Sequence, residues 1–376
     1  GIPQAAFAAE CMADDLALAL HMDPLEFRKK NCMRPGYVDP HTHVKCNTYG
    51  LAECMEKGRE FIRWDEKRRE YENQTGPVRK GIGMAIFCYK TGVYPISLET
   101  ASCRMILNQD GSMQLQMGAT EIGQGADTVF TQMAAEVTGI TEDKVNVLST
   151  QDTDVSPFDT GAYASRQTYV SGMAVKKTGA IFKEKILDYA AYMLEKPQDT
   201  LDVRDNHIVD KVTGTQLLPM EELATTAFYS LDRSVHITAE ATSHCKTNTF
   251  ATGACFAEVE VDMPLGKVKV TNIVNVHDSG KLINPKLAAA QVHGGMSMGL
   301  GYGLSEELLF DAKGRPLNDN LLDYKLPTAM DTPDLNALFV ELDDPTGPFG
   351  NKALGEPPAI PVAPAVRNAV LIATGV

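Results

Sequence analysis

The sequence predicts an α+β fold, in which helices and strands mix without a regular strand–helix–strand alternation. Several long segments carry apolar residues at helical spacing, and others have the character of strands. The chain has 376 residues, of which 44% are hydrophobic. A chain of this length buries a large core and is expected to form more than one structural unit.

Helices dominate the first part of the chain. Phe7, Cys11 and Leu16 recur at helical spacing, and the pair Asp23-Pro24 is a typical helix start. The last of the expected helices is charged and carries the only tryptophan. We expect helices over residues 4–20, 23–31 and 51–71, a polar loop over residues 34–49 and a linker over residues 73–80.

Strands and helices mix after this linker. Asn108-Gln-Asp-Gly111 has the composition of a hairpin turn, and Met263-Pro-Leu-Gly266 separates a second pair of strands. We expect strands over residues 81–89, 102–117, 145–148 and 254–276, and helices over residues 125–137, 170–194, 285–309 and 363–373.

Charge and composition exclude several classes of function. The net charge of −14 disfavours nucleic-acid and anionic-membrane partners, which need basic stripes. No apolar run approaches the roughly 20 residues of a membrane span, and no signal segment opens the chain. The eight cysteines are scattered without a C-x-x-C pair, as is typical of reduced thiols in a cytoplasmic protein. We expect a cytoplasmic location.

Metal-ligand spacing is weak in this sequence. His41-Thr-His43-Val-Lys-Cys46 is the nearest pattern, but no second ligand cluster lies at zinc spacing. A solvated loop is therefore favoured there. We expect no iron–sulfur or zinc site within this chain.

Glu356 is the first candidate for chemistry. It lies between Gly355, which permits unusual backbone angles, and Pro357 with Pro358, which fix φ. A carboxylate on so stiff a turn has a fixed direction and little freedom to relax toward water, as a general base requires. The alternative is a surface loop that happens to contain a glutamate.

Residues 118–128 join a strand to a helix through Gly123, Gln124 and Gly125. Bare backbone N–H groups at a helix N-terminus favour an anion, and glycine allows close approach. The carboxamide of Gln124 both donates and accepts hydrogen bonds. The segment is not a dinucleotide fingerprint, because the third glycine and a parallel βαβ unit are absent. The alternative is a structural turn.

Residues 151–168 form a long irregular segment, rich in hydroxyl groups and small residues, that leads into a helix. Long loops in compact proteins are usually functional. The hydroxyl groups, the glycine and the arginine of this segment suit phosphate and nucleobase contacts. The alternative is a plain loop of Asx and Ser turns.

Residues 284–303 combine helical character with five glycines. A helical glycine costs up to about 1 kcal/mol, so such a helix makes sense where something packs very close to it. A neighbouring strand would explain the glycines but not the polarity of Gln291. His293 is expected to be a hydrogen-bonded structural residue.

Together these segments resemble the molybdenum-binding subunit of the xanthine dehydrogenase family of molybdenum hydroxylases. The likeness covers most of the chain and is greatest to bacterial multi-subunit xanthine dehydrogenases. No single motif is decisive, but six in the same order are highly specific. The six segments are residues 118–125, 151–165, 276–285, 291–295, 323–327 and 355–358.

The resemblance implies a molybdenum centre on a pterin, in bacteria usually molybdopterin cytosine dinucleotide. Glu356 would be the base that deprotonates a metal-bound hydroxyl, whose oxygen attacks an electron-poor carbon beside a ring nitrogen while hydride passes to a sulfido ligand. The cofactor would carry the redox chemistry and the protein would hold it. The implied cofactor-binding residues are Gly123, Gln124, Gly125, Thr160, Gly161, Ser165, Gln167, Gln291 and Gly355.

The sequence departs from the family pattern at its start. The first molybdenum domain, with a further glycine-rich loop and the purine-orienting Glu and Arg, would lie upstream of Gly1, so we expect a fragment or a processed chain. Residues 1–75 would be the helical end of that first domain plus a linker, and residues 76–376 the second molybdenum-cofactor-binding domain. Residues 89–95 lack an expected aromatic pair, so substrate identity rests on overall likeness.

The resemblance therefore implies hydroxylation of a purine, hypoxanthine or xanthine, with water as the oxygen source. Electrons would leave through iron–sulfur and FAD subunits. Alternatives on the same scaffold are aldehyde oxidation, nicotinate hydroxylation and reduction of a CoA thioester. A further alternative is a catalytically empty scaffold that needs a complementary chain, and we expect the isolated fragment to be inactive.

Overall fold

The structure is a computed structural model that describes residues 1–41, 43, 45–149, 152–247 and 249–376. Thr42 and Val44 of the histidine-containing loop, and Gln151 of the predicted cofactor loop, lie outside the described residues. The chain forms two compact units: the first comprises Gly1–Lys90, Thr249–Asp344 and Lys352–Val376, and the second comprises Thr91–Asn248 and Pro345–Asn351. The expected division near residue 75 concerns family domains and stays a prediction.

The first unit is built on a four-stranded sheet of mixed direction. β9 pairs antiparallel with both β1 and β10, whereas β11 pairs parallel with β10. β9 is buried along almost all of its length, which explains why its sequence is nearly continuous in small and apolar residues. The strands are β1 (Val78–Lys90), β9 (Phe250–Asp262), β10 (Lys267–Asp278) and β11 (Leu335–Phe339).

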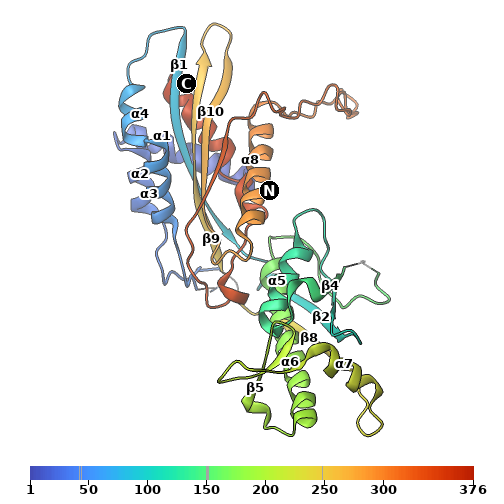
Figure 1. Cartoon of the computed structure of the whole chain (residues 1–376). Coiled ribbons are helices and arrows are strands. Elements are labelled where there is room, and N and C mark those ends of the chain that lie inside the picture. Colours follow the sequence, from blue (N-terminus) through green and yellow to red (C-terminus); the bar gives the residue numbers. More distant parts are fainter. Residues whose placement is uncertain (42, 44, 150–151, 248) are drawn as a thin grey trace. The chain divides into compact units, whose positions relative to one another are not determined.

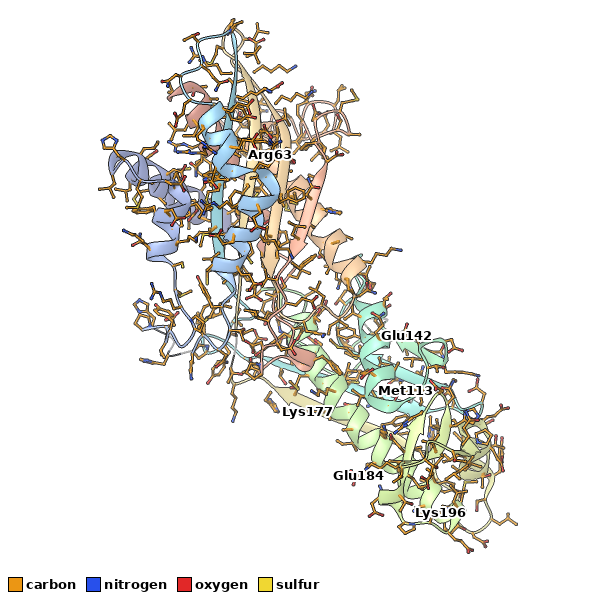
Figure 2. All side chains as sticks on the ribbon, turned by 60° about the vertical axis from the view of Figure 1, so that its left-hand side comes forward. Arg63, Met113, Glu142, Lys177, Glu184 and Lys196 are labelled. Atoms are coloured by element: carbon orange, nitrogen blue, oxygen red, sulfur yellow. The ribbon has the colours of Figure 1, made fainter. Side chains whose placement is uncertain are left out.

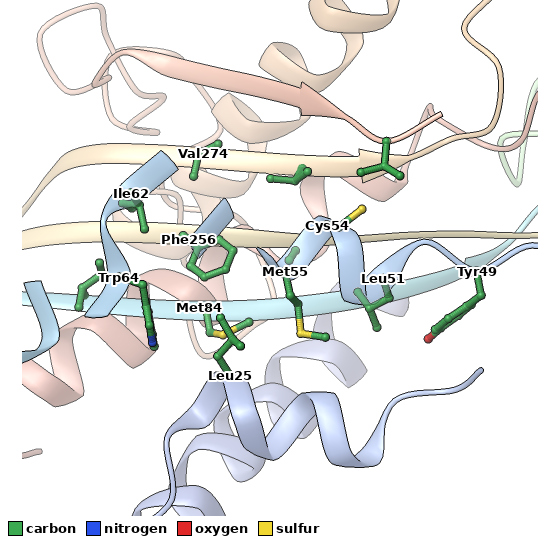
Figure 3. Packing of buried hydrophobic residues seen from close by; sticks show 14 of the residues in the cluster. Leu25, Tyr49, Leu51, Cys54, Met55, Ile62, Trp64, Met84, Phe256 and Val274 are labelled. Atoms are coloured by element: carbon green, nitrogen blue, oxygen red, sulfur yellow. The ribbon is translucent and has the colours of Figure 1, made fainter. Parts of the chain in front are cut away.

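Helices cover both faces of this sheet (Figure 1). Phe256 and Val274 point to one face and pack in a cluster with residues of α2, α3 and α4 (Figure 3). Ala257 and Ile273 point to the other face and pack with residues of α8 and α9. The alternation of strand side chains thus divides the core into two layers. The helices are α1 (Ile2–Ala19), α2 (Pro24–Asn31), α3 (Leu51–Ile62), α4 (Trp64–Glu70), α8 (Pro285–Leu304) and α9 (Val362–Thr374).

The second unit contains one sheet in the order β4-β3-β2-β8 and another in the order β5-β6-β7. Their strands are β2 (Thr100–Leu107), β3 (Met113–Met117), β4 (Val145–Leu148), β5 (Leu201–Arg204), β6 (His207–Asp210), β7 (Gln216–Pro219) and β8 (Thr238–His244). The helices are α5 (Ala126–Thr138), α6 (Gly172–Leu194) and α7 (Met220–Tyr229), with a π-helical turn over Gln167–Ser171. Lys177 and Glu184 mark the course of α6 in Figure 2.

The expected mixture of helices and strands is confirmed, but two long helices are shorter than predicted. The helix expected over residues 51–71 is divided into α3 and α4 by Arg63, whose backbone is left-handed at φ 61° and ψ 49°. This turn brings Trp64 into the core, where its ring meets Phe256 edge to face at 5.6 Å. The helix expected over residues 285–309 ends at Leu304, and the hydroxyl of Ser305 bonds to the carbonyl of Lys325.

The sequence patterns predict no element between residues 195 and 249, where the structure has β5, β6, β7, α7 and β8. Three of these strands have only four residues each, too few for an alternating pattern to show. Within the part of the chain that the structure describes, no helix has the length and apolar composition needed to cross a membrane.

His277 lies near the end of β10 and is fully buried. Its ring centroid is 4.9 Å from that of Phe87, and among the described residues neither ring nitrogen has a hydrogen-bond partner. Burial lowers the pKa of His277 from 6.5 to about 3, because a charged imidazolium there would lose its hydration. The side chain is therefore neutral at pH 7.

This buried histidine makes stability dependent on pH. The unfolded chain binds a proton at His277 below pH 6.5, whereas the folded chain does not until about pH 3, so stability is lost as pH falls through this window. Between pH 7 and pH 5 the loss is about 2 kcal/mol. His277→Leu is expected to reduce the change in the free energy of unfolding between pH 7 and pH 5. Urea unfolding followed by Trp64 fluorescence gives the measurement. If the free energy of unfolding depends on pH as steeply in this variant as in the wild type, His277 is not the responsible group. The control is His21→Asn, which replaces an exposed histidine.

Close packing of α9 on β1 depends on Gly83. A Cβ at this position would lie 2.1 Å from the backbone nitrogen of Ala369 and 2.5 Å from the carbonyl oxygen of Ala365. Gly83→Ala is therefore expected to lower the free energy of unfolding by about 1–3 kcal/mol. Gly294 in α8 has no atom within 4 Å of such a Cβ, so Gly294→Ala is expected to raise it by up to about 1 kcal/mol. Equal effects of the two changes would contradict this packing.

Candidate active site

Two of the predicted cofactor residues meet in the second unit. The side-chain nitrogen of Gln124 donates to Gln167 Oε1 at 2.7 Å and to the carbonyl of Thr120 at 2.8 Å. Gln167 donates to the same carbonyl at 3.0 Å. Gln124 Oε1 accepts from the backbone of Ile122 at 2.7 Å. Both N–H donors of Gln124 are thus used within the protein. Its oxygen accepts one hydrogen bond from Ile122 and has a second lone pair that can accept another.

The N-terminus of α5 is not bare, contrary to the expectation for Gly123 and Gly125. Glu121 Oε1 accepts from the backbone N–H of Gly123 at 2.8 Å and of Gly125 at 3.1 Å, and Oε2 accepts from Asp127 at 3.0 Å. Partial burial raises the pKa of Glu121, but these backbone donors outweigh it, so the pKa is lowered overall. The internal carboxylate occupies the place predicted for a ligand anion.

Arg166 serves the fold of the long loop and is not available to a phosphate. Its side chain is fully buried, with Nε 2.5 Å from Glu99 Oε2 and Nη1 2.6 Å from Asp159 Oδ1. It also donates to the carbonyls of Gly161 and Thr100. The expectation that this arginine contacts phosphate is therefore wrong. The carboxylates of Glu99 and Asp159 neutralise its positive charge.

The predicted loop residues Thr160, Gly161 and Ser165 lie in an irregular backbone. Gly161 has φ 120°, and Ala164 and Ser165 have φ 48° and 50°, values that side-chain-bearing residues seldom adopt. Thr160 Oγ1 is buried and has no hydrogen-bond partner among the described residues. A buried hydroxyl in this position fits a polar ligand that completes its hydrogen bonding.

In the first unit, Glu356 precedes a short 3-10 turn over Pro357–Ala359. Asn275 Nδ2 donates to the carbonyl of Pro358 at 2.9 Å, and the hydroxyl of Tyr302 donates to the carbonyl of Ala359. The turn residues are buried, whereas Gly355 and Glu356 are exposed. The stiff turn is thus observed, and the carboxylate that it carries is exposed.

Glycines of α8 make room for that turn and for the start of α9 rather than for a neighbouring strand. A Cβ on Gly295 would lie 2.5 Å from Pro358 Cβ, and one on Gly299 would lie 2.5 Å from Val362 Cβ. Gln291, one turn before Gly295, is half-buried. Its side-chain amide has no partner within the described ranges.

A buried ion pair that the sequence patterns do not single out precedes Glu356. Lys352 Nζ lies 2.6 Å from Asp278 Oδ2, and both side chains have 0% exposure. Lys352 also donates to Thr48 Oγ1 at 3.1 Å, and Asp278 Oδ2 accepts from the backbone of Gly50 at 2.8 Å. The signal in the sequence is a lysine within a segment rich in glycine, proline and apolar residues.

These groups suit a polar organic cofactor. In the second unit, Thr160 supplies a buried hydroxyl without a partner among the described residues, and Gln124 a carbonyl with spare capacity. In the first unit, Gln291 supplies a half-buried amide. No cluster of three or more His, Cys, Asp or Glu residues with metal-binding geometry occurs in the described part of the chain. Hydroxyl and amide groups of this kind suit hydrogen bonds to the organic part of a cofactor.

Comparison with known proteins gives a family. Residues 57–333 match the model of the molybdopterin cofactor-binding domain. The chain is 48% identical, over its whole length, to the putative xanthine dehydrogenase molybdenum-binding subunit XdhA of Escherichia coli, and covers 50% of that protein. It is 32% identical to the probable hypoxanthine oxidase XdhD of the same species, of which it covers 40%.

A solved structure supports the same relationship. The reconstituted CO dehydrogenase from Oligotropha carboxidovorans superposes with a TM-score of 0.90 at 26% identity, over 100% of this chain and 49% of that one. The chain thus spans about half the length of the relatives it matches. It belongs to the molybdopterin cofactor-binding domain family, and its relatives are molybdenum hydroxylases that include the xanthine dehydrogenase molybdenum-binding subunit.

Proposed function

We propose that the chain is part of a molybdenum hydroxylase that acts on a purine, hypoxanthine or xanthine, at a carbon adjacent to a ring nitrogen, with water as the oxygen source. The observation that carries the proposal is the clamped turn at Pro357–Ala359, which fixes an exposed carboxylate at Glu356. The purine is favoured because the 48% identical relative is a putative xanthine dehydrogenase subunit.

The cofactor proposed is molybdopterin cytosine dinucleotide with molybdenum, which supplies the redox chemistry when bound. In the second unit, Thr160 and Ser165 would donate hydroxyl hydrogen bonds to it, and Gln124 would present its oxygen. In the first unit, Gln291 would contribute its half-buried amide. The remaining positions proposed to approach it are Gly123, Gly125, Gly161, Gln167 and Gly355.

Glu356 would act as the general base. An ionised carboxylate is an acceptor only, so its oxygens take a proton directly when the turn aims them at the reacting group. Afterwards, the exposed position allows the proton to pass to water. Gly355, which has no side chain, would allow a small heterocycle to approach the carboxylate.

Electrons are proposed to leave through iron–sulfur and FAD subunits, with an upstream molybdenum domain completing the site. The chain spans about half of its relatives, so the isolated fragment is expected to show no turnover and to retain no cofactor. Measurement of molybdenum, and of CMP released on heating, tests this on the purified fragment. Hydroxylation of a purine by the fragment alone would overturn it.

Aldehyde oxidation, nicotinate hydroxylation and reduction of a CoA thioester remain alternatives on the same scaffold. Side-by-side assays with hypoxanthine, xanthine, nicotinate, an aldehyde and a CoA thioester in the complete protein separate them. Preference for a substrate other than the purines would replace the proposed substrate but keep the reaction class.

Glu356→Gln is expected to abolish turnover in the complete protein, by at least about 100-fold in kcat, because the amide cannot accept the proton. Molybdenum content is expected to stay at the wild-type level, since the turn is held by backbone carbonyls. The matched control is Glu307→Gln, which neutralises an exposed carboxylate on the same unit. Near-normal turnover of the Glu356 variant would exclude its role as the base.

Gln167→Leu is expected to weaken cofactor retention by about 10-fold, because it removes the partner that orients the Gln124 amide. The measurement is the molybdenum and CMP content per molecule of the complete protein, after the same dialysis for each variant. Gln114→Leu, a half-buried glutamine on β3, is the control. Equal retention in both variants would remove the amide pair from the proposed binding site.

A further inference from the structure

In the ion pair of Lys352 and Asp278, both side chains are completely removed from water. Two buried charges lose their hydration, and replacing such a pair by apolar residues of similar volume is often neutral or stabilising. Stability alone is therefore a weak explanation for this pair. The pair also has a defined geometry. The Lys352 ammonium lies against the Asp278 carboxylate, which in turn accepts a hydrogen bond from the backbone N–H of Gly50.

Strand β10 and the residue that follows it hold the segment of Glu356 at two points. At the near end, the backbone N–H of Lys352 donates to the carbonyl of Ser279 at 2.8 Å, next to the ion pair. At the far end, Asn275 Nδ2 donates to the carbonyl of Pro358 at 2.9 Å. Glu356 lies between these two attachments along the chain.

We propose that Lys352, acting through Asp278, is a positioning residue for Glu356. The catalytic part of this inference rests on the proposed function of Glu356, whereas the anchoring does not. Without the ion pair, the segment keeps the attachment at Pro358 and the backbone bond to Ser279 but loses its side-chain anchor at the near end. The direction of the carboxylate then varies, and a displacement of about 1 Å at a catalytic group costs about 100-fold in rate.

The ion pair of Arg28 and Asp14 provides a matched control. Its Nη1–Oδ1 distance is also 2.6 Å, with exposures of 2% and 1%, and it lies in the same unit. It joins α2 to α1, where Arg28 also pairs with Glu10, and within the described residues no hydrogen bond or ion pair links it to Lys352 or Asp278. Asp14→Asn therefore perturbs a buried ion pair of the same kind away from the segment of Glu356.

The test uses the complete protein that contains this chain, with variants Lys352→Met, Lys352→Arg, Asp14→Asn and the double variant Lys352→Met/Asp278→Asn. Amide hydrogen exchange of residues 352–360, read by mass spectrometry, reports anchoring without any need for turnover. In the double variant we expect exchange at least about 10-fold faster. We also expect kcat for hypoxanthine to fall by about 10- to 100-fold with KM little changed.

Lys352→Arg, which keeps the charge, is expected to restore part of the slow exchange and part of kcat. Asp14→Asn is expected to leave the exchange of residues 352–360 and kcat as in the wild type. Unchanged exchange in the double variant, or an equal fall of kcat in Asp14→Asn, would overturn the proposal. If Lys352→Met does not accumulate, the neutral double variant decides. Activity retained by Glu356→Gln would remove the proposed base, while the exchange measurement still decides the anchor.

Discussion

The support of Glu356 depends on one constraint, which is close contact between α8 and the residues that follow the carboxylate. Gly295 and Gly299 leave no side chain between the helix and this segment. Protein interiors are packed closely enough that an added methyl group must displace a neighbour. Hydrogen bonds from Asn275 and Tyr302 to backbone carbonyls then fix the orientation that contact alone would leave open.

Much of the secondary structure could be predicted, because long helices and strands reveal their periodicity in a single sequence. The limits are local. A one-residue left-handed break such as Arg63 leaves the apolar pattern intact on both sides, so residues 51–71 look like one helix. The short strands between residues 201 and 219 contain too few side chains to establish a period.

The candidate site was harder to predict, since the residue types that bind ligands are also those that complete a fold. Glu121 and Arg166 lie in segments that suit anions, yet Glu121 caps its own helix and Arg166 balances Glu99 and Asp159. The glycines of residues 284–303, apart from Gly294, correctly indicated close packing. Their partner was a distant segment, and spacing along a sequence carries no information about which segment that is.

The order of the strands has a consequence for synthesis. β1 ends at Lys90, and its neighbour β9 begins with Phe250, which is paired with that same residue. The intervening 91–248 segment forms most of the second unit. During translation β1 must therefore wait for its neighbour, while most of the second unit emerges before β9 and only Pro345–Asn351 of that unit follows later. A folded insertion brings its own ends together and so reduces the loop-closure entropy that the waiting strand has to overcome.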